Sequence, residues 1–178
     1  MVRLALLARH GFVRTGERSL RYARTLDEPL PNAPLPYGIA LRPVRGEAEV
    51  ELLVALHRAA FGTQRMNVES RLALMRAPGY VPEMDTVAEV PSGELAGFCV
   101  GGFADEAHRV GYTDPVGVHP HYQRRGLARA MMVAVLGELR RRGAEAAEVG
   151  TSSENLPMCR LAESLGYRVV SERVWLRK

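Results

Sequence analysis

Hydrophobic residues recur along the chain with two periods, and these periods predict which segments form helices and which form strands. Apolar residues three or four positions apart predict helices over residues 47–61 and 68–76. A longer helix ends at Gly143 and repeats an apolar residue at every fourth position: Leu127, Met131, Val135 and Leu139. The last predicted helix begins after Asn155, a residue type that caps helices, and ends at Gly166.

Short apolar runs between turn residues predict the strands. They cover residues 39–42, 85–90, 95–103, 109–118 and 145–151, and two short strands finish the chain. The tetrapeptide PSGE between the second and third of these runs has the residues of a hairpin turn. The order of elements predicts an α/β domain of the α+β kind, with a mixed, mostly antiparallel central sheet and helices on both faces.

Proline placement divides the chain into three parts. Residues 27–37 are rich in proline, which disfavours helix and predicts an extended linker. The linker separates a short N-terminal piece, residues 1–26, from the main domain, residues 38–178. Aligning Gly11 with Gly166 matches HGFVRTGER to LGYRVVSER, so the N-terminal piece is interpreted either as a chance echo or as the tail of a second copy of the domain.

Composition narrows the class of protein. With 178 residues, 47% of them hydrophobic, the chain is long enough for one well-cored domain. The net charge of +4 comes almost entirely from arginine, with acidic residues interspersed, and no nucleic-acid module accompanies it. We therefore expect no nucleic-acid partner.

Cysteine usage and N-terminal hydrophobicity bear on the compartment. Cys99 and Cys159 stand in apolar surroundings, which favours buried thiols in a reducing compartment. The first apolar run is shorter than a signal peptide needs, and no run is long enough to cross a membrane. We expect a cytoplasmic protein without membrane attachment. The spacing of the histidines matches no set of metal ligands, so no metal is predicted.

The segment Gln123–Arg124–Arg125–Gly126–Leu127–Ala128 carries the predicted chemistry. Gly126 and the small Ala128 let a diphosphate approach the N–H groups of the first helical turn, where the helix dipole favours anions. The guanidinium groups of three arginines can neutralise a further phosphate: Arg124, Arg125 and Arg129. Upstream, Pro115 cannot donate to a sheet ladder, which predicts a bulged or parted strand with free backbone groups for an amide-bearing ligand.

A ligand with a diphosphate and a peptide-like arm is coenzyme A, and here the sequence resembles the GNAT superfamily of acyl-CoA-dependent N-acetyltransferases. The signature of that superfamily is Gln or Arg, any two residues, Gly, any one residue, and Gly or Ala. The segment QRRGLA within VGVHPHYQRRGLARAMM matches it. The resemblance covers residues 37–178 and includes Asn155, Leu161, Gly166 and Tyr167. Within the superfamily, YTDPVGVHP and the N-terminal echo are most similar to tandem proteins of the mycothiol synthase kind.

The resemblance implies a set of coenzyme-binding residues and a direct transfer of acetyl from acetyl-CoA to an amine. The implied set is Val116, Gly117, Val118, Gln123, Arg124, Arg125, Gly126, Leu127, Ala128, Arg129 and Asn155. The backbone N–H near Val118 would stabilise the oxyanion. For Asn155, N-capping and contact with the coenzyme arm both stay open.

The catalytic residues are less well defined. Asp114 is the first candidate for the base and Tyr112 the second, each with the alternative of a surface carboxylate or a core aromatic. In many family members a tyrosine, the usual acid for the leaving thiolate, stands where this chain has Ala162. Three alternatives stay open: water protonates the thiolate, another residue such as Tyr122 or Ser153 does so, or the domain binds acyl-CoA without efficient turnover.

Two functions from different classes follow. The first is an N-acetyltransferase that acts on the amine of a small molecule or peptide, as a monomer or homodimer. The second is a non-catalytic, regulatory acyl-CoA-binding domain, which Ala162 and the short N-terminal piece favour. Acceptor specificity is expected from the first two predicted helices and the loop FGTQRMN, and one of the loop or surface histidines is an alternative lining residue.

Overall fold

The computed structural model describes residues 2–105, 107 and 109–178 of the chain. Its α-helices are α1 Val2–Arg9, α2 Val50–Phe61, α3 Val68–Met75, α4 Leu127–Arg141 and α5 Leu156–Ser164. Its strands are β1 Val13–Thr25, β2 Ala40–Pro43, β3 Asp85–Glu89, β4 Leu95–Asp105, β5 Val110–Val118, β6 Ala146–Ser152 and β7 Arg168–Arg177. Short 3-10 turns are η1 Glu47–Glu49, η2 Pro82–Met84 and η3 Pro120–Tyr122.

The strands form one seven-stranded sheet in the order β2-β3-β4-β5-β6-β1-β7. β2 to β5 pair antiparallel in sequence order, β1 pairs antiparallel with β7, and β5 pairs parallel with β6. This confirms the predicted mixed, mostly antiparallel sheet. The prediction of two short strands at the C-terminus is wrong, because residues Arg168–Arg177 form a single strand.

The chain divides into two compact units. The first joins the chain up to Ala23 with Val149–Lys178, and the second is Arg24–Glu148. β1 and β6 each contribute residues to both units. The second unit contains the predicted coenzyme loop and the candidate base.

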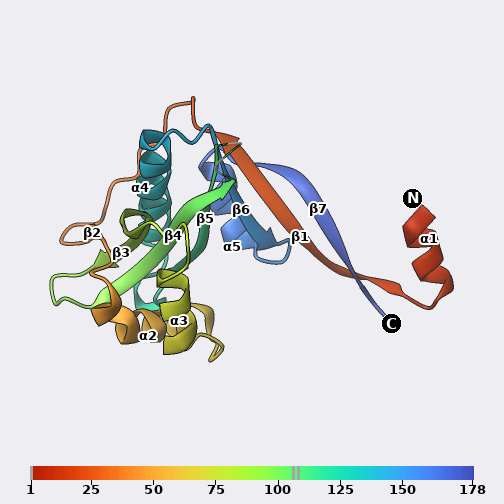
Figure 1. Cartoon of the computed structure of the whole chain (residues 1–178), viewed down its shortest axis with the longest axis horizontal. Helices are drawn as coiled ribbons and strands as arrows, with labels where there is room; N and C mark the ends of the chain where they lie inside the picture. The colour runs from red at the N-terminus through yellow and green to blue at the C-terminus, as the bar shows by residue number, and fades with distance from the viewer. Residues whose placement is uncertain (1, 106, 108) are drawn as a thin grey trace. The chain divides into compact units, whose positions relative to one another are not determined.

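Helices cover both faces of the sheet in the second unit, as predicted (Figure 1). On one face, residues of β4 such as Phe98 and Val100 pack into a buried apolar cluster with Leu53 and Leu56 of α2. Partly buried Leu74 and Met75 of α3 pack against the same cluster. Since side chains alternate along a strand, the intervening residues of β4 face the other way.

That other face of the sheet lies against α4, and glycine allows the close approach. A Cβ on Gly101 would clash with a methyl group of Val135, and one on Gly97 would lie 2.8 Å from Met131. The stripe of residues at every fourth position of α4 is fully buried, as its spacing predicted. The helix therefore backs the strands whose ends carry the candidate site.

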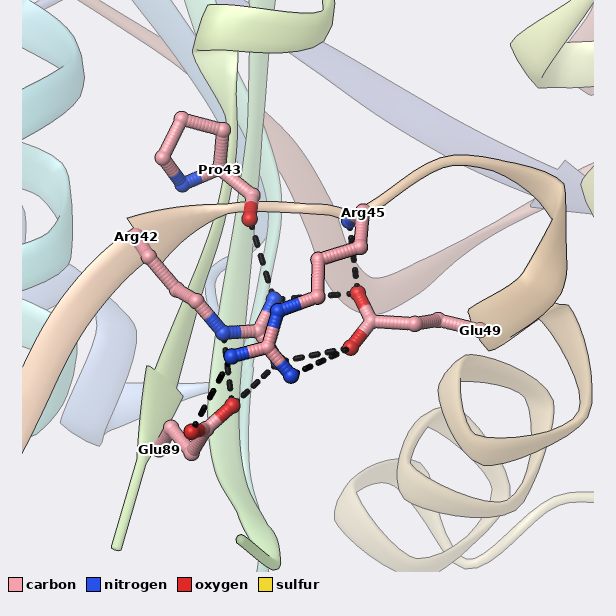
Figure 2. A network of polar contacts seen from close by, with 5 residues as sticks. All are labelled: Arg42, Pro43, Arg45, Glu49 and Glu89. Atoms are coloured by element: carbon pink, nitrogen blue, oxygen red, sulfur yellow. Dashed lines mark hydrogen bonds and ion pairs between the residues drawn. The ribbon is translucent and has the colours of Figure 1, made fainter.

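A polar network fixes β2 to the start of α2 (Figure 2). The Glu49 carboxylate accepts hydrogen bonds from the Arg42 guanidinium at 2.6 and 3.0 Å and from the Arg45 backbone N–H at 2.7 Å. Arg42 also donates from Nε to Glu89 of β3 at 2.6 Å. These bonds lower the pKa of Glu49, chiefly through Arg42, so its carboxylate stays ionised although the residue is buried.

The first unit contains a long strand pair, β1 beside β7, coloured red and blue in Figure 1. The predicted N-cap of α5 is confirmed, because Asn155 Oδ1 accepts from the Met158 N–H at 3.2 Å. Tyr22 of β1 is buried and its hydroxyl donates to Glu163 of α5 at 3.4 Å. The N-terminal strand is thus packed on the helix that precedes β7.

Candidate functional site

The predicted irregularity of β5 is present beside Pro115. Cys99 pairs with Val116 and Gly101 pairs with Thr113, so two residues of β5, Asp114 and Pro115, lie opposite Val100 alone. Such a bulge interrupts the ladder and turns the strand locally. It places Asp114 and the backbone of residues 116–118 at the end of β5 that leads into the candidate coenzyme loop.

The loop after β5 is held close to that strand end. Pro120 begins η3, where its fixed φ is suited to the first helical position, and the side chain of His119 accepts from the His121 N–H. Gln123 donates from Nε2 to the Val118 carbonyl at 3.2 Å. This bond joins two of the predicted coenzyme-binding residues directly, one on the strand and one in the loop.

The loop ends in an unusual backbone conformation that opens the start of α4. Arg124 and Gly126 both have positive φ, at 60° and 82°. A Cβ at Gly126 would meet nothing within 4 Å, so there is space above the loop. No side chain caps α4, and its first turn has no acidic residue. The first N–H groups of a helix have no partner within the helix, so Leu127 and Ala128 present donors here.

Arginines surround the same helix end with positive charge. Arg124 and Arg125 are exposed, and the Arg125 guanidinium lies 5.5 Å from the centre of the Tyr122 ring. Arg129 is half-buried, and its Nε lies 3.5 Å from the Asn32 carbonyl of the proline-rich linker. Cations at a helix N-terminus are unfavourable unless an anion balances them, so this end of α4 is suited to binding phosphate groups.

Tyr112 lies on the face of β5 opposite α4, and Asp114 follows two residues later, within the bulge. Gly111 points toward α4, where a Cβ would lie 2.5 Å from Leu139, so Tyr112 points the other way and lies across Gly102. Asp114 is exposed, but surrounding protein atoms displace part of its hydration and raise the pKa of its carboxyl group. Burial, followed by the charges of Asp85 and Asp114, raises the pKa of Tyr112. A carboxylate with a raised pKa is a stronger base, which suits Asp114 to proton abstraction.

The candidates for the acid have other partners or are unsuitable. Ala162 is fully buried in α5 and brings no hydroxyl group. The Tyr122 hydroxyl donates to Glu94 at 3.0 Å, and this bond raises its pKa. Ser153 Oγ accepts from the Arg18 N–H at 3.0 Å. Asn155 and Ser153 belong to the first unit, whereas the other predicted site residues belong to the second.

The buried polar pair of Arg71 and Asp85 was missed in the sequence, and His57, expected at the surface or in a loop, is a half-buried residue of α2. Arg71 of α3 is 5% exposed and donates to the fully buried Asp85 at the start of β3, which also accepts from the Tyr80 hydroxyl at 2.7 Å. His57 of α2 contacts Phe61 and Phe98 through its ring. The available signals were an arginine within the apolar run VESRLALM and an aspartate opening a buried strand.

Two classes of feature are not found in the described part of the chain. Among residues 2–105, 107 and 109–178, no three His, Cys, Asp or Glu side chains are grouped so as to hold a metal ion. His108 lies outside these residues. None of the described helices combines the length and apolar character needed to cross a bilayer.

Known proteins share both the sequence pattern and the fold. The model of the acetyltransferase (GNAT) family matches residues 51–167. The chain is 33% identical over 166 residues to a mycothiol acetyltransferase of Thermobispora bispora, covering 88% of this chain and 56% of that protein. It is 29% identical over 177 residues to the mycothiol acetyltransferase of Propionibacterium freudenreichii, covering 94% and 56%. The chain therefore spans just over half the length of these curated relatives.

A solved structure of a GCN5-related N-acetyltransferase from Sphaerobacter thermophilus superposes with a TM-score of 0.86 at 27% identity. The alignment covers 99% of this chain and 55% of that one. The match extends over residues of both compact units.

Proposed function

Because the chain belongs to the acetyltransferase (GNAT) family, we propose that it transfers an acetyl group from acetyl-CoA to an amine. The observation that carries the proposal is the open start of α4 beside the bulged end of β5. There, free N–H donors, a glycine with space above it and exposed arginines adjoin strand residues 116–118. A diphosphate with a peptide-like arm is the ligand that such a pair of features complements.

The proposed binding roles divide along this geometry. The N–H groups of Leu127 and Ala128 bind the diphosphate, and the guanidinium groups of Arg124, Arg125 and Arg129 balance its charge. Backbone groups of residues 116–118 pair with the amide arm of the coenzyme. Gln123 holds the loop to Val118 and so keeps the two parts in place. Asn155, which caps α5, is retained as a candidate for the arm.

In the proposed reaction the acceptor amine first loses a proton to Asp114, directly or through water. The free amine then attacks the thioester carbonyl, so a C–N bond forms while the C–S bond breaks. The Val118 N–H stabilises the negative charge that develops on the carbonyl oxygen. Because Ala162 supplies no hydroxyl group, we propose that the leaving thiolate takes its proton from water.

The acceptor proposed first is the one that the relatives' names indicate, the amine that becomes acetylated in mycothiol. The test combines calorimetric titration with acetyl-CoA and a thiol-release assay against a panel of primary amines that includes the unacetylated form of mycothiol. Binding with amine-dependent thiol release supports the transferase. Binding without release on the whole panel favours the regulatory acyl-CoA-binding alternative, and absence of binding refutes both.

We also propose that residues 1–26 are the tail of a second GNAT-like domain. α1, Gly11 and β1 repeat the order α5, Gly166 and β7, and both glycines have positive φ. The offset of 155 residues between the two glycines also relates the strand pairing, because Arg18 pairs with Val174 and Ser19 with Arg173. Arg18 and Arg173 are 155 residues apart, and so are Ser19 and Val174, so the offset converts the first pair into the second. This exchange indicates a local twofold relation between β1 and β7.

This second proposal has its own test. A chain beginning at residue 27 would lose both the partner strand of β7 and the buried Tyr22. We expect it to be much less stable to urea than the 178-residue chain. Equal stability would show that β1 is dispensable and would contradict the pairing on which the proposal depends.

A further inference from the structure

A small cavity lies between α2, α3 and the bulge of β5. Its volume is about 20 Å³, enough for one water-sized group. Most of its wall is apolar, Pro115 of the bulge lines it, and the polar residues that line it are His57 and Arg71. Pro115 directly follows Asp114 in the chain, so one wall of the cavity comes from the residue next to the proposed base.

Both polar residues have a buried atom without a partner. A terminal nitrogen of Arg71 bonds to Asp85, but among the described residues nothing accepts from its Nε. His57 Nδ1 is likewise buried without a partner in the described part of the chain, as is Oδ1 of Asp85, which does not line the cavity. Buried polar atoms are nearly always hydrogen-bonded, so these two mark a place for a group that is not part of the protein.

The chemistry of the two atoms defines that group. Arg71 Nε–H can only donate. Burial, followed by the positive charge of Arg71, lowers the pKa of His57, so its ring is neutral at neutral pH. A neutral imidazole has one donor and one acceptor nitrogen, and the nearby guanidinium favours the lone pair on Nδ1. The cavity therefore offers one donor and one acceptor.

We propose that His57 and Arg71 form a specificity subsite that receives one hydroxyl group of the acceptor amine. The hydroxyl oxygen accepts from Arg71 Nε, and its hydrogen is donated to His57 Nδ1. This assignment rests on the proposed function and adds to it a chemical requirement on the acceptor: a hydroxyl group a few bonds from the reacting nitrogen.

Charged groups do not fit the subsite. The Arg71 guanidinium is already paired with Asp85, so a carboxylate would enter without a free countercharge and would face the lone pair of His57 Nδ1. An ammonium group would meet the N–H of Arg71, and an alkyl group would leave both polar atoms unsatisfied. A hydroxyl group satisfies both atoms at no cost in buried charge.

The experiment compares three primary amines of similar length: 3-amino-1-propanol, n-butylamine and 3-aminopropanoate. Their binding is measured by calorimetry on the whole chain saturated with coenzyme A, so that no acetyl transfer occurs. We expect 3-amino-1-propanol to bind about tenfold more tightly than n-butylamine, because the alkyl group leaves a buried donor and a buried acceptor unpaired. We expect 3-aminopropanoate to bind no better than n-butylamine.

The variant His57→Phe keeps an aromatic ring of similar shape beside Phe61 and Phe98 but removes the acceptor nitrogen. We expect its preference for the hydroxylated amine to fall below about twofold. His10→Phe makes the same change at an exposed histidine outside the second unit and should leave the preference intact. In the unaltered chain, 15N resonances of labelled histidine give a second readout: 3-amino-1-propanol, and not n-butylamine, should shift the His57 Nδ1 resonance.

Equal affinity for the hydroxylated and alkyl amines overturns the subsite. Tightest binding of 3-aminopropanoate, or no binding of any probe up to its solubility limit, overturns it as well. A preserved preference in binding, together with no thiol release from acetyl-CoA with any amine, would refute the transferase function and leave the hydroxyl subsite standing.

Discussion

Replacing Gly126 tests the proposed phosphate-binding loop most directly. Its φ of 82° lies in the left-handed region, where an L-residue costs about 1–2 kcal/mol. A Cβ there meets nothing within 4 Å, so Gly126→Ala adds backbone strain without a steric clash. In Gly126→Glu, by contrast, a carboxylate also enters the space proposed for the diphosphate. At about 5 Å and an effective dielectric constant near 20, one pair of like charges costs about 3 kcal/mol, more than a hundredfold in affinity.

Gly143 supplies a matched control at the other end of the same helix. Its φ is 89°, and the nearest atom to a Cβ there, a terminal nitrogen of Arg109, lies 4.0 Å away. Gly143→Glu should therefore lose about as much stability as Gly126→Glu, a fall in Tm of about 2–4 °C for each kcal/mol. It should bind coenzyme A with unchanged affinity, because its carboxylate is at the C-terminal end of α4.

The assay is calorimetric titration of coenzyme A into both variants and the unaltered chain, well below their Tm, with Tm measured separately. A large affinity loss confined to Gly126→Glu is expected. If the two variants lost affinity equally, the effect would come from general destabilisation, and if neither did, the diphosphate would not lie at the start of α4.

Three further predictions concern the base, the network of Figure 2 and the packing of α4. Asp114→Asn should lower kcat/KM about a hundredfold near pH 7 and less near pH 9, where more amine is already free; an equal loss at both values would exclude Asp114 as the base. Glu49→Gln should lower the free energy of unfolding by about 1–3 kcal/mol at pH 7. Folding lowers the pKa of Glu49, so the stability that its carboxylate contributes is present above the pKa of the unfolded chain and is lost as the pH falls through the pKa of the folded protein. Urea titrations should therefore show that the two proteins differ less in free energy of unfolding in acid than at pH 7. A difference that stays constant with pH would contradict this account. Gly101→Ala should lower the free energy of unfolding by about 1–3 kcal/mol, because the added Cβ clashes with Val135. The control Gly16→Ala has open space around its Cβ and should change that free energy by less than about 0.5 kcal/mol. Similar urea midpoints for the two variants would contradict the close packing of α4 on β4.

The helices and central strands were predictable because one face of each is buried. In α4 the apolar residue at every fourth position marks the buried stripe, and the predicted ends lie within two residues of the observed ones. β7 was misjudged for the opposite reason. Most of its residues are exposed, so the alternation that marks a strand is absent and Ser171–Glu172–Arg173 resembles a turn. In β1, alternation begins only at Leu20, Tyr22 and Arg24, which are the buried residues.

The candidate site divides in the same way. The start of α4 was predictable because the phosphate binding proposed there depends on consecutive residues: a glycine with positive φ, the N–H groups after it and the arginines around it. The bulge was predictable because Pro115 lacks the N–H that a regular ladder needs. Both features arise from backbone chemistry within a few residues.

The subsite of His57 and Arg71 has no local signature, because its walls come from α2, α3, β4 and β5, which are brought together only by folding. In sequence, Arg71 resembles any arginine on a helix surface; its burial becomes evident only when Asp85 of β3 is seen to accept its hydrogen bond. Coenzyme binding by a chain of this fold can therefore be predicted from one short segment. The proposed acceptor preference, in contrast, depends on which side chains meet at these scattered positions, and no short segment of the sequence specifies them.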